Sequence, residues 1–307
     1  YAYSERFMLV LSHDEVVHGK ASMLGKMPGT REEQFANLKA SYGYMMCHPG
    51  KKLLFMGQDI GEYDEWNENR EVEWYLTEEA DHKGLQEFVK ALNHLYTSAP
   101  ALSEKDTSWD GFEWIDCISA NDCILSFVRK GKKDEDMLLV VVNFANVERK
   151  GFQVGVPLNG KYKEILNSDA KEYGGQGRTN PRVKTAAEEE WDGREYSIRM
   201  TQAPLSVSIF SYQPYTKEEL KEIARKKAEK ARKEKEAARK KKSAKKTASG
   251  RSAKTLKEEL EEKVFAAEAK ISENGEVEKP VRVTKPRKRM TETAETTETE
   301  ENGEGTE

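Results

Sequence analysis

Near the N-terminus, apolar residues form two short continuous runs, each of which ends abruptly in a polar loop. The first run covers residues 7–11 and is followed by His13 and Asp14, and the second covers residues 53–56 and is followed by Gln58. A short continuous apolar run bounded by polar residues predicts a strand that is buried on both faces. The pattern therefore predicts two buried strands, each of which opens into a polar loop.

Apolar residues at helical spacing follow each of these runs. Thr30 and Glu33 have the spacing of a capping box at the start of the first helix, and Pro49 with Gly50 ends it. A second apolar stripe at the same spacing covers residues 85–96. The order strand, helix, strand, helix is typical of parallel α/β folds.

Beyond the second helix the apolar period changes from 3.6 to 2. Strands are predicted at residues 112–118, 123–128, 137–144, 152–156, 162–166, 195–200 and 205–210. In the last of these, Leu205, Val207 and Ile209 alternate with Ser206 and Ser208, which predicts one solvent-facing side. Seven short antiparallel strands predict a small β-sandwich.

The end of the chain has a different composition. After Tyr215 the only aromatic residue is Phe265, and residues 225–246 contain thirteen basic and three acidic side chains. Such a segment buries too little apolar surface to offset its conformational entropy. We therefore expect a charged tail over residues 216–307, disordered or locally helical, after two folded domains.

The two folded domains are predicted at residues 1–105 and 106–215. Over all 307 residues, 51 Lys and Arg side chains and 55 Asp and Glu side chains give a net charge of -4. No run approaches the roughly 18 to 20 apolar residues of a membrane span, and the N-terminus lacks the pattern of a signal peptide. We expect a soluble, cytoplasmic protein that does not bind membranes. Because the chain starts at Tyr1 and soon enters an apolar run, we also expect it to lack the N-terminal part of a longer protein.

Candidate chemistry lies in the two loops, because side chains at the carboxyl ends of parallel strands meet at one edge of a sheet. The carboxylate of Asp14 beside the imidazole of His13 is suited to stabilise a developing cation or to hold sugar hydroxyls. The plainer alternative is that Asp14 caps a turn and His13 is only a polar neighbour. Trp66 is equally suited to stack on a sugar face or to pack in the core.

Other constellations are weaker. His13 and His18 are five residues apart, which is off the spacing that places two imidazoles on one helix face, so no metal site and no cofactor are expected. The glycine-rich residues 173–177 indicate a turn rather than a phosphate loop. The three cysteines show no paired spacing and are expected to be small buried apolar groups; they are Cys47, Cys117 and Cys123.

Several segments together resemble one known family. Residues 12–20 read Ser-His-Asp-Glu-Val-Val-His-Gly-Lys, and residues 48–58 read His-Pro-Gly-Lys-Lys-Leu-Leu-Phe-Met-Gly-Gln. Residues 92–96 read Leu-Asn-His-Leu-Tyr, and residues 204–210 read Pro-Leu-Ser-Val-Ser-Ile-Phe. In this order and spacing, over residues 1–213, they resemble bacterial glycogen branching enzymes of the α-amylase superfamily.

The resemblance implies the last two βα units of a (β/α)8 barrel, followed by the C-terminal antiparallel β-sandwich of that superfamily. It implies that Asp14 is the catalytic carboxylate that stabilises the transition state and that His13 binds substrate hydroxyls. It also makes Gln58, Asp59 and Trp66 candidates for substrate binding, although Asp59 stands where the family usually has Glu. The implied reaction of glycogen biosynthesis cuts an α-1,4-glucan through a covalent glycosyl-enzyme and passes the segment to a 6-hydroxyl.

The resemblance also limits the expected activity. The family's nucleophilic aspartate and its acid/base glutamate lie on earlier barrel strands that this chain does not include, so we expect the isolated chain to be inactive and its barrel portion to be poorly stable. Two alternatives stay open: a glucan-binding module without catalysis, and an interaction protein led by its tail. The basic segment lacks aromatic side chains for base stacking, so nucleic acid is not the expected partner. The oligomeric state stays open.

Overall fold

The computed structural model describes residues 6–119 and 121–273, with side chains of the last helix described only at residues 217–238, 240 and 257–263. The chain divides into two compact units, residues 1–225 and 226–307. No helix within the described residues is both long enough and apolar enough to cross a membrane.

The first two strands form a parallel pair. β1 (Met8–Leu11) lies beside β2 (Lys51–Leu54), with Met8 opposite Lys51 at the start of the pair. The prediction of two strands with the same direction is confirmed, and the loops after both strands therefore leave the same edge. The prediction of burial on both faces is wrong for both strands: Met8 and Val10 are each about half exposed, β2 has no fully buried residue, and Met56 at the end of the second run is exposed.

Two long helices follow these strands. α1 (Arg31–Cys47) starts with the predicted capping box, in which the Glu33 N–H donates to Thr30 Oγ1 at 3.4 Å and the Thr30 N–H donates to Glu33 Oε2 at 2.6 Å. α2 (Ala80–Ser98) carries the second predicted apolar stripe. Short 3-10 helices link the longer elements: His13–Glu15, Trp74–Glu78, Pro100–Leu102, Trp109–Gly111, Asp134–Asp136 and Lys171–Tyr173.

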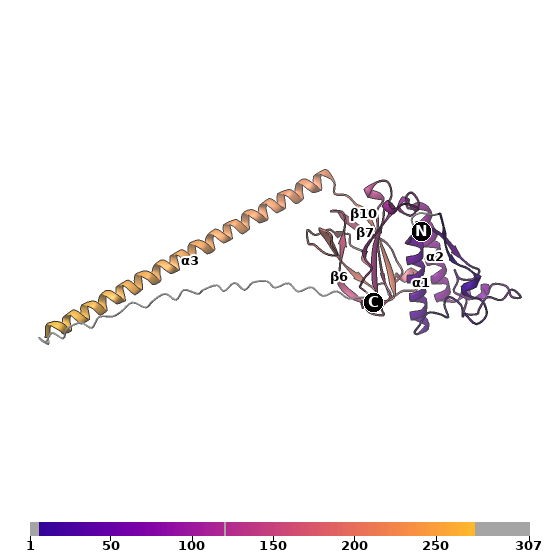
Figure 1. Cartoon of the computed structure of the whole chain (residues 1–307), viewed down its shortest axis with the longest axis horizontal. Helices are drawn as coiled ribbons and strands as arrows, with labels where there is room; N and C mark the ends of the chain where they lie inside the picture. The colour runs from indigo at the N-terminus through magenta and orange to yellow at the C-terminus, as the bar shows by residue number, and fades with distance from the viewer. Residues whose placement is uncertain (1–5, 120, 274–307) are drawn as a thin grey trace, which may run out of the picture. The chain divides into compact units, whose positions relative to one another are not determined.

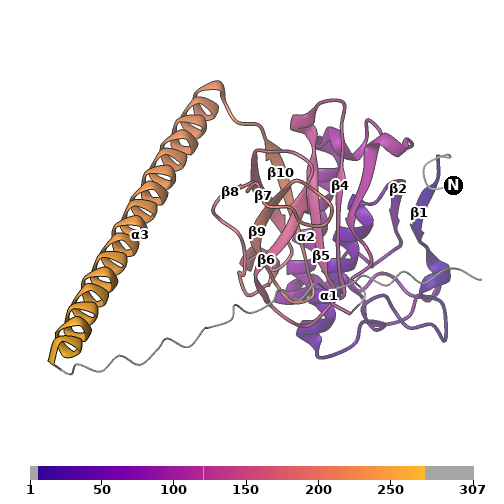
Figure 2. The same ribbon diagram turned by 60° about the vertical axis from the view of Figure 1, so that its left-hand side comes forward.

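The remaining strands form two antiparallel sheets (Figure 2). The larger sheet has the order β3-β4-β5-β10-β7-β8, and β6 and β9 pair as a smaller second sheet. The strands are β3 (Phe112–Asp116), β4 (Ile124–Arg129), β5 (Leu138–Asn143), β6 (Arg149–Val156), β7 (Lys161–Asn167), β8 (Lys184–Thr185), β9 (Tyr196–Gln202) and β10 (Ser206–Gln213). The seven predicted strands are confirmed with small changes at their ends, and the sequence missed β8, which has two residues.

Both faces of the six-stranded sheet are covered, which makes three layers. One face packs against the β6–β9 pair, with Phe210 of β10 in the same apolar cluster as Val154 and Ile198. On the other face α1 and α2 lie against the sheet (Figure 1), and Val207 shares a cluster with Leu38. The two predicted parts of the folded region therefore share a hydrophobic core.

This arrangement overturns the prediction that β10 has a solvent-facing side. Ser206 and Ser208 are both buried, because the second sheet covers the side that they occupy. Their hydroxyls are satisfied internally: Ser206 Oγ donates to the Ala203 carbonyl at 2.7 Å, and Ser208 Oγ accepts from Asn167 Nδ2 at 3.2 Å. A serine pattern at period 2 thus marks buried hydrogen-bonded side chains here, not a wet face.

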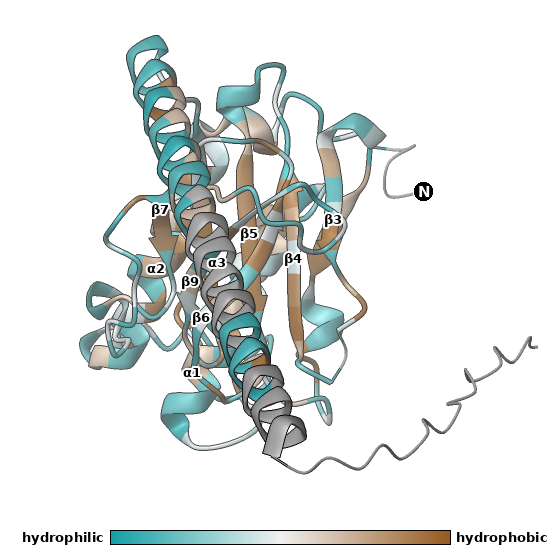
Figure 3. Ribbon diagram, turned by 90° about the vertical axis from the view of Figure 1, so that its left-hand side faces the viewer, coloured by the Kyte–Doolittle hydropathy of each residue, from teal (hydrophilic) through white to brown (hydrophobic). Residues whose placement is uncertain are grey.

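The charged tail begins as a helix. α3 (Lys217–Glu273) starts with its own capping contact, in which the Glu219 N–H donates to Thr216 Oγ1 at 3.2 Å. The turns whose side chains are described are mostly hydrophilic (Figure 3), and ion pairs at i, i+4 lie along them, such as Lys233 with Glu229. Of the two forms expected for the tail, the structure has the helical one over these residues instead of disorder, because Ala, Lys, Arg and Glu are strong helix formers. Residues 274–307 lie outside the described part.

Two of the three cysteines differ from expectation. Cys47 is fully buried at the end of α1, and burial raises the pKa of its thiol to about 12, so it is an inert apolar group as predicted. Cys117 and Cys123 are exposed in the turn between β3 and β4. Both lie outside the strands, so neither side chain points into the core. Their burial was predicted wrongly because it was inferred from residue type alone.

Candidate functional site

The loop after β1 folds into a 3-10 turn that presents His13 and Asp14. Ser12 caps this turn, because its hydroxyl accepts a hydrogen bond from the Asp14 N–H at 3.2 Å. The Ser12 hydroxyl also lies 3.4 Å from Asp14 Oδ2, and His13 Nε2 lies 3.3 Å from Asp14 Oδ1. Lys20 Nζ donates to the backbone carbonyl of Asp14 at 2.6 Å and ties the loop together. The imidazole and the carboxylate are therefore adjacent, as the sequence suggested.

Aromatic rings from the second loop support the imidazole. Phe55 directly follows β2, and its ring centroid lies 6.0 Å from that of His13. Trp66 packs edge-on against both, at 5.7 Å from His13 and 5.4 Å from Phe55. The parallel pairing of β1 and β2 brings these three rings together, because both loops leave the same edge of the pair.

Glu65 joins the loop after β2 to the loop after β1. Its carboxylate accepts backbone N–H groups of Gly19 at 2.9 Å and Ala21 at 2.7 Å. These two hydrogen bonds, helped by nearby His18, lower the pKa of Glu65. The backbone N–H of Trp66 in turn donates to the Val16 carbonyl at 2.9 Å. The sequence did not predict this positioning role of Glu65, because its partners are backbone groups more than 40 residues away.

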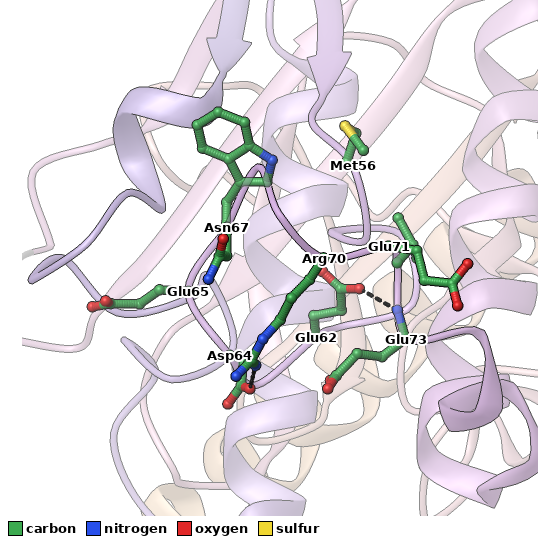
Figure 4. Close-up of a pocket in the computed structure, with 10 residues that line it drawn as sticks. Met56, Glu62, Asp64, Glu65, Asn67, Arg70, Glu71 and Glu73 are labelled. Atoms are coloured by element: carbon green, nitrogen blue, oxygen red, sulfur yellow. Dashed lines mark hydrogen bonds and ion pairs between the residues drawn. The ribbon is translucent and has the colours of Figure 1, made fainter.

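A shallow acidic pocket adjoins Trp66 (Figure 4). Glu62 accepts the Glu73 N–H at 2.6 Å, and Arg70 Nη1 pairs with Asp64 Oδ2 at 2.8 Å, as the dashed lines in Figure 4 mark. Burial raises the pKa of Glu62 despite that hydrogen bond, and the neighbouring carboxylates add to the effect. The cavity has a volume of about 20 Å³, close to the space that one water molecule needs. Within this chain it is therefore a shallow depression in the surface.

The other two predicted substrate-binding residues, Gln58 and Asp59, differ in whether they line a pocket. Gln58 is buried and lines a second small pocket together with Trp66, while its Oε1 accepts the Phe55 N–H at 3.1 Å. Gln58 therefore shapes the loop that carries Phe55. Asp59 is half-buried in the same turn and is not among the residues that line either pocket.

The His13 and Asp14 side chains are open to solvent in this chain, with exposed fractions of 50% and 73%. An exposed imidazole and carboxylate over a ring platform are suited to take sugar hydroxyls while the rings contact the apolar face of a sugar. Trp74 and Trp109 are also exposed. A cluster of possible metal ligands among the described residues lies elsewhere, at Glu79, Asp81 and His82.

The comparison with protein families matches the β-layers. Residues 114–213 match the family described as "Alpha amylase, C-terminal all-beta domain". This range runs from β3 to the end of β10 and contains both antiparallel sheets. The all-β character predicted for this region is thereby confirmed.

Curated relatives extend the match to the N-terminal part. The 1,4-alpha-glucan branching enzyme GlgB of Geobacillus stearothermophilus is 48% identical over 225 residues, which cover 73% of this chain and 35% of that enzyme. The chain resembles the C-terminal third of glycogen branching enzymes. A second branching enzyme, from Aquifex aeolicus (strain VF5), is 48% identical over 213 residues, with 69% of this chain and 34% of the enzyme covered.

The chain thus spans about a third of the length of the curated branching enzymes that it matches. Among solved structures, the crystal structure of AmyP in complex with maltose aligns with 68% of this chain and 41% of its own, at 15% identity and a TM-score of 0.44. That overlap is too low to support a conclusion about the fold.

Proposed function

We propose that this chain supplies part of the active site of a 1,4-α-glucan branching enzyme, with Asp14 as the transition-state stabiliser and His13 as a ligand of substrate hydroxyls. The observation that carries the proposal is the convergence of the two loops, in which His13 contacts both Phe55 and Trp66 beside Asp14. The 48% identity to a branching enzyme over 225 residues and the family match over residues 114–213 support it.

The geometry suggests how these residues act. The sugar at the cleavage point develops positive charge as the α-1,4 bond breaks, and the adjacent Asp14 carboxylate stabilises that charge. His13 and the Trp66 ring orient the sugar, the first through its hydroxyls and the second through its apolar face. In a retaining transfer the segment passes through a covalent glycosyl-enzyme to a glucose 6-hydroxyl. The nucleophile and the acid/base for that step belong to earlier strands of the family's barrel.

We further propose that residues 1–105 are the last two βα units of the (β/α)8 barrel and that residues 106–215 are its C-terminal β-sandwich. The parallel direction of β1 and β2 supports this assignment. The exposed apolar side chains of Met8 and Val10 support it as well, because barrel strands are covered on both sides by neighbouring elements. A two-stranded parallel sheet leaves such a face open.

The isolated 307-residue chain should therefore show no branching activity, because it carries one of three catalytic carboxylates. An iodine-staining assay of purified chain with amylose tests this expectation. Vigorous branching by the chain alone would mean that the catalytic groups are misassigned.

A chimera tests whether this chain supports branching when the other catalytic groups are present. Residues 6–213 of this chain would replace the matching C-terminal third of the Geobacillus stearothermophilus enzyme, to which the chain is 48% identical. We expect the chimera to branch amylose. A folded chimera that binds glycogen in affinity electrophoresis but leaves the glucan chain-length profile unchanged would instead favour a glucan-binding module.

A further inference from the structure

A cluster of possible ligands lies at the start of α2, away from the residues assigned to catalysis. Glu79 directly precedes the helix and makes no side-chain capping bond, Asp81 lies in its first turn, and His82 follows. One ligand atom from each of the three lies within 4.8 Å of the others. Adjacent acidic residues alone do not make a metal site, so the state of the histidine decides whether this cluster is one.

His82 is fully buried, and one of its two ring nitrogens has no hydrogen-bond partner. Its Nδ1 lies 2.7 Å from the Ile60 carbonyl, which only accepts, so we assign the proton to Nδ1. Nε2 is then a bare lone pair, buried and without a hydrogen bond among the described residues. The ring is held edge-on by Phe35, at 4.9 Å, and by Tyr63, at 5.8 Å.

The orphaned nitrogen is directed toward the carboxylates. His82 Nε2 lies 3.8 Å from Glu79 Oε2, which is beyond a hydrogen bond. Two metal–ligand bonds of about 2.0–2.2 Å each span at most about 4.4 Å, so the 3.8 Å gap between His82 Nε2 and Glu79 Oε2 accepts a metal ion with little movement. A histidine whose Nδ1–H is held by a carbonyl is also the tautomer that metal sites use.

We propose that Glu79, Asp81 and His82 form a binding site for a divalent transition-metal ion of the Zn²⁺ class. One imidazole with two carboxylates suits Zn²⁺, Co²⁺ or Ni²⁺ better than Ca²⁺ or Mg²⁺, which prefer all-oxygen sites. The ion tethers the start of α2 to the turn that carries Ile60, because His82 bonds that turn through its other nitrogen.

Arg31 competes for the same carboxylates. Its guanidinium bonds both oxygens of Asp81, with Nη2 at 2.9 Å from Oδ1, and it also bonds Glu79 Oε2. Asp81 Oδ1 further accepts the His82 N–H at 3.0 Å. The rings of Phe35 and Tyr63 hold the guanidinium nearby, at 5.6 Å and 5.3 Å. A metal ion must therefore displace or share this cation, and removal of the Arg31 charge should tighten metal binding.

Metal titration of the full metal-free chain tests the site, with Zn²⁺ measured by calorimetry and Co²⁺ by its visible spectrum. We expect a single equivalent bound, a rise in melting temperature, and a Co²⁺ spectrum with nitrogen ligation. His82→Gln should abolish this binding, and the exposed-residue variant Glu79→Gln should weaken it without a folding defect. Arg31→Gln should tighten it by about tenfold or more.

Two matched controls separate this site from surface binding. His94→Gln changes an exposed histidine of the same helix, and His18→Gln changes a histidine that lies 3.3 Å from Glu65. Both should bind metal as the unaltered chain does. The proposal is overturned if the unaltered chain binds no ion, if Glu79→Gln and His82→Gln bind as well as it does, or if His18→Gln is the variant that loses binding.

Discussion

At the scale of single residues, a buried ion pair joins α1 to the β-sheet. Arg129 is fully buried, and its Nη2 lies 2.8 Å from Asp106 Oδ1. The same guanidinium donates to the Cys47 carbonyl at 2.7 Å, and Asp106 accepts the Gly50 N–H at 3.1 Å. The pair thus links the end of α1 and the loop before β2 to the strand β4.

Asp106→Ala should lower the free energy of unfolding by about 3–5 kcal/mol, because it leaves the Arg129 charge buried without its partner. Urea unfolding of the two chains measures the difference. Asp110→Ala, at an exposed position of the neighbouring turn, should change stability by less than about 0.5 kcal/mol. Equal effects of the two substitutions would contradict the role of the pair.

A buried lysine gives the stability a pH dependence. Lys39 is buried in α1, its Nζ donates to the Tyr173 carbonyl at 2.6 Å, and burial lowers its pKa to about 8, partly opposed by Asp169 and Glu32. Between pH 8 and the unfolded value of 10.5 the unfolded chain binds the proton that the folded chain has lost. The free energy of unfolding therefore rises with pH in this window.

Relative to Lys39→Met, the unaltered chain should gain roughly 2 kcal/mol of stability from pH 8 to pH 10, because most of the shift in pKa from 10.5 to about 8 falls within this window. Urea unfolding of both chains at each pH gives the difference. Titrations common to both chains, such as that of Cys47, cancel in this comparison. Stability curves that run parallel across the window would show that Lys39 has an ordinary pKa in the folded chain.

The sequence predicted which side chains of the two loops lie close together better than it predicted burial. His13 and Asp14 could be singled out because a polar cluster directly after an apolar run predicts a strand end, and both lie in the turn after β1. Trp66 could be singled out only by its residue type. The burial of Ser208 could not be predicted, because it depends on the second sheet. The positioning role of Glu65 depends on backbone groups that no side-chain pattern reveals.

At the scale of elements, a glycine sets how closely α1 approaches the sheet. A Cβ added to Gly43 would lie 2.3 Å from Val207 Cγ1 of β10, far inside van der Waals contact. The helix and the strand therefore meet without a side chain between them at this point. This contact is one reason why the helices and the β-layers share a core.

Gly43→Ala should destabilise the chain by about 1–3 kcal/mol, because overpacking outweighs the gain in helix propensity of about 1 kcal/mol. Val207→Ala should remove the clash, so the double variant should be more stable than the sum of the two single effects predicts. Chemical denaturation of the four chains completes this cycle. A stabilised Gly43→Ala chain would mean that α1 does not approach β10 so closely.

Local signals explain which elements the sequence predicted. The capping box of Thr30 and Glu33 lies within four residues, so the start of α1 could be predicted from it. β8 has only two residues, and its pairing with the start of β7 is a tertiary contact with no pattern of its own. The length of α3 could not be predicted from the sequence, because its mostly polar side chains form no apolar stripe that would mark where the helix begins and ends.

At the scale of the whole molecule, the loops after β1 and β2 carry the residues proposed to bind glucan, and the β-layers match an amylase-type C-terminal domain. The chain spans about a third of the branching enzymes that it matches, so catalysis is to be tested where the other catalytic groups are present. The chimera with the Geobacillus stearothermophilus enzyme provides that setting.

The most direct test is the branching rate of that chimera with Asp14→Asn. The account predicts a loss of about a hundredfold or more, because the substitution removes the charge that stabilises the transition state and keeps the shape of the side chain. Asp110→Asn, at an exposed position of the turn before β3, should retain most of the activity and so serves as the matched control. Full activity of the Asp14→Asn chimera would contradict the assignment on which the proposed function depends.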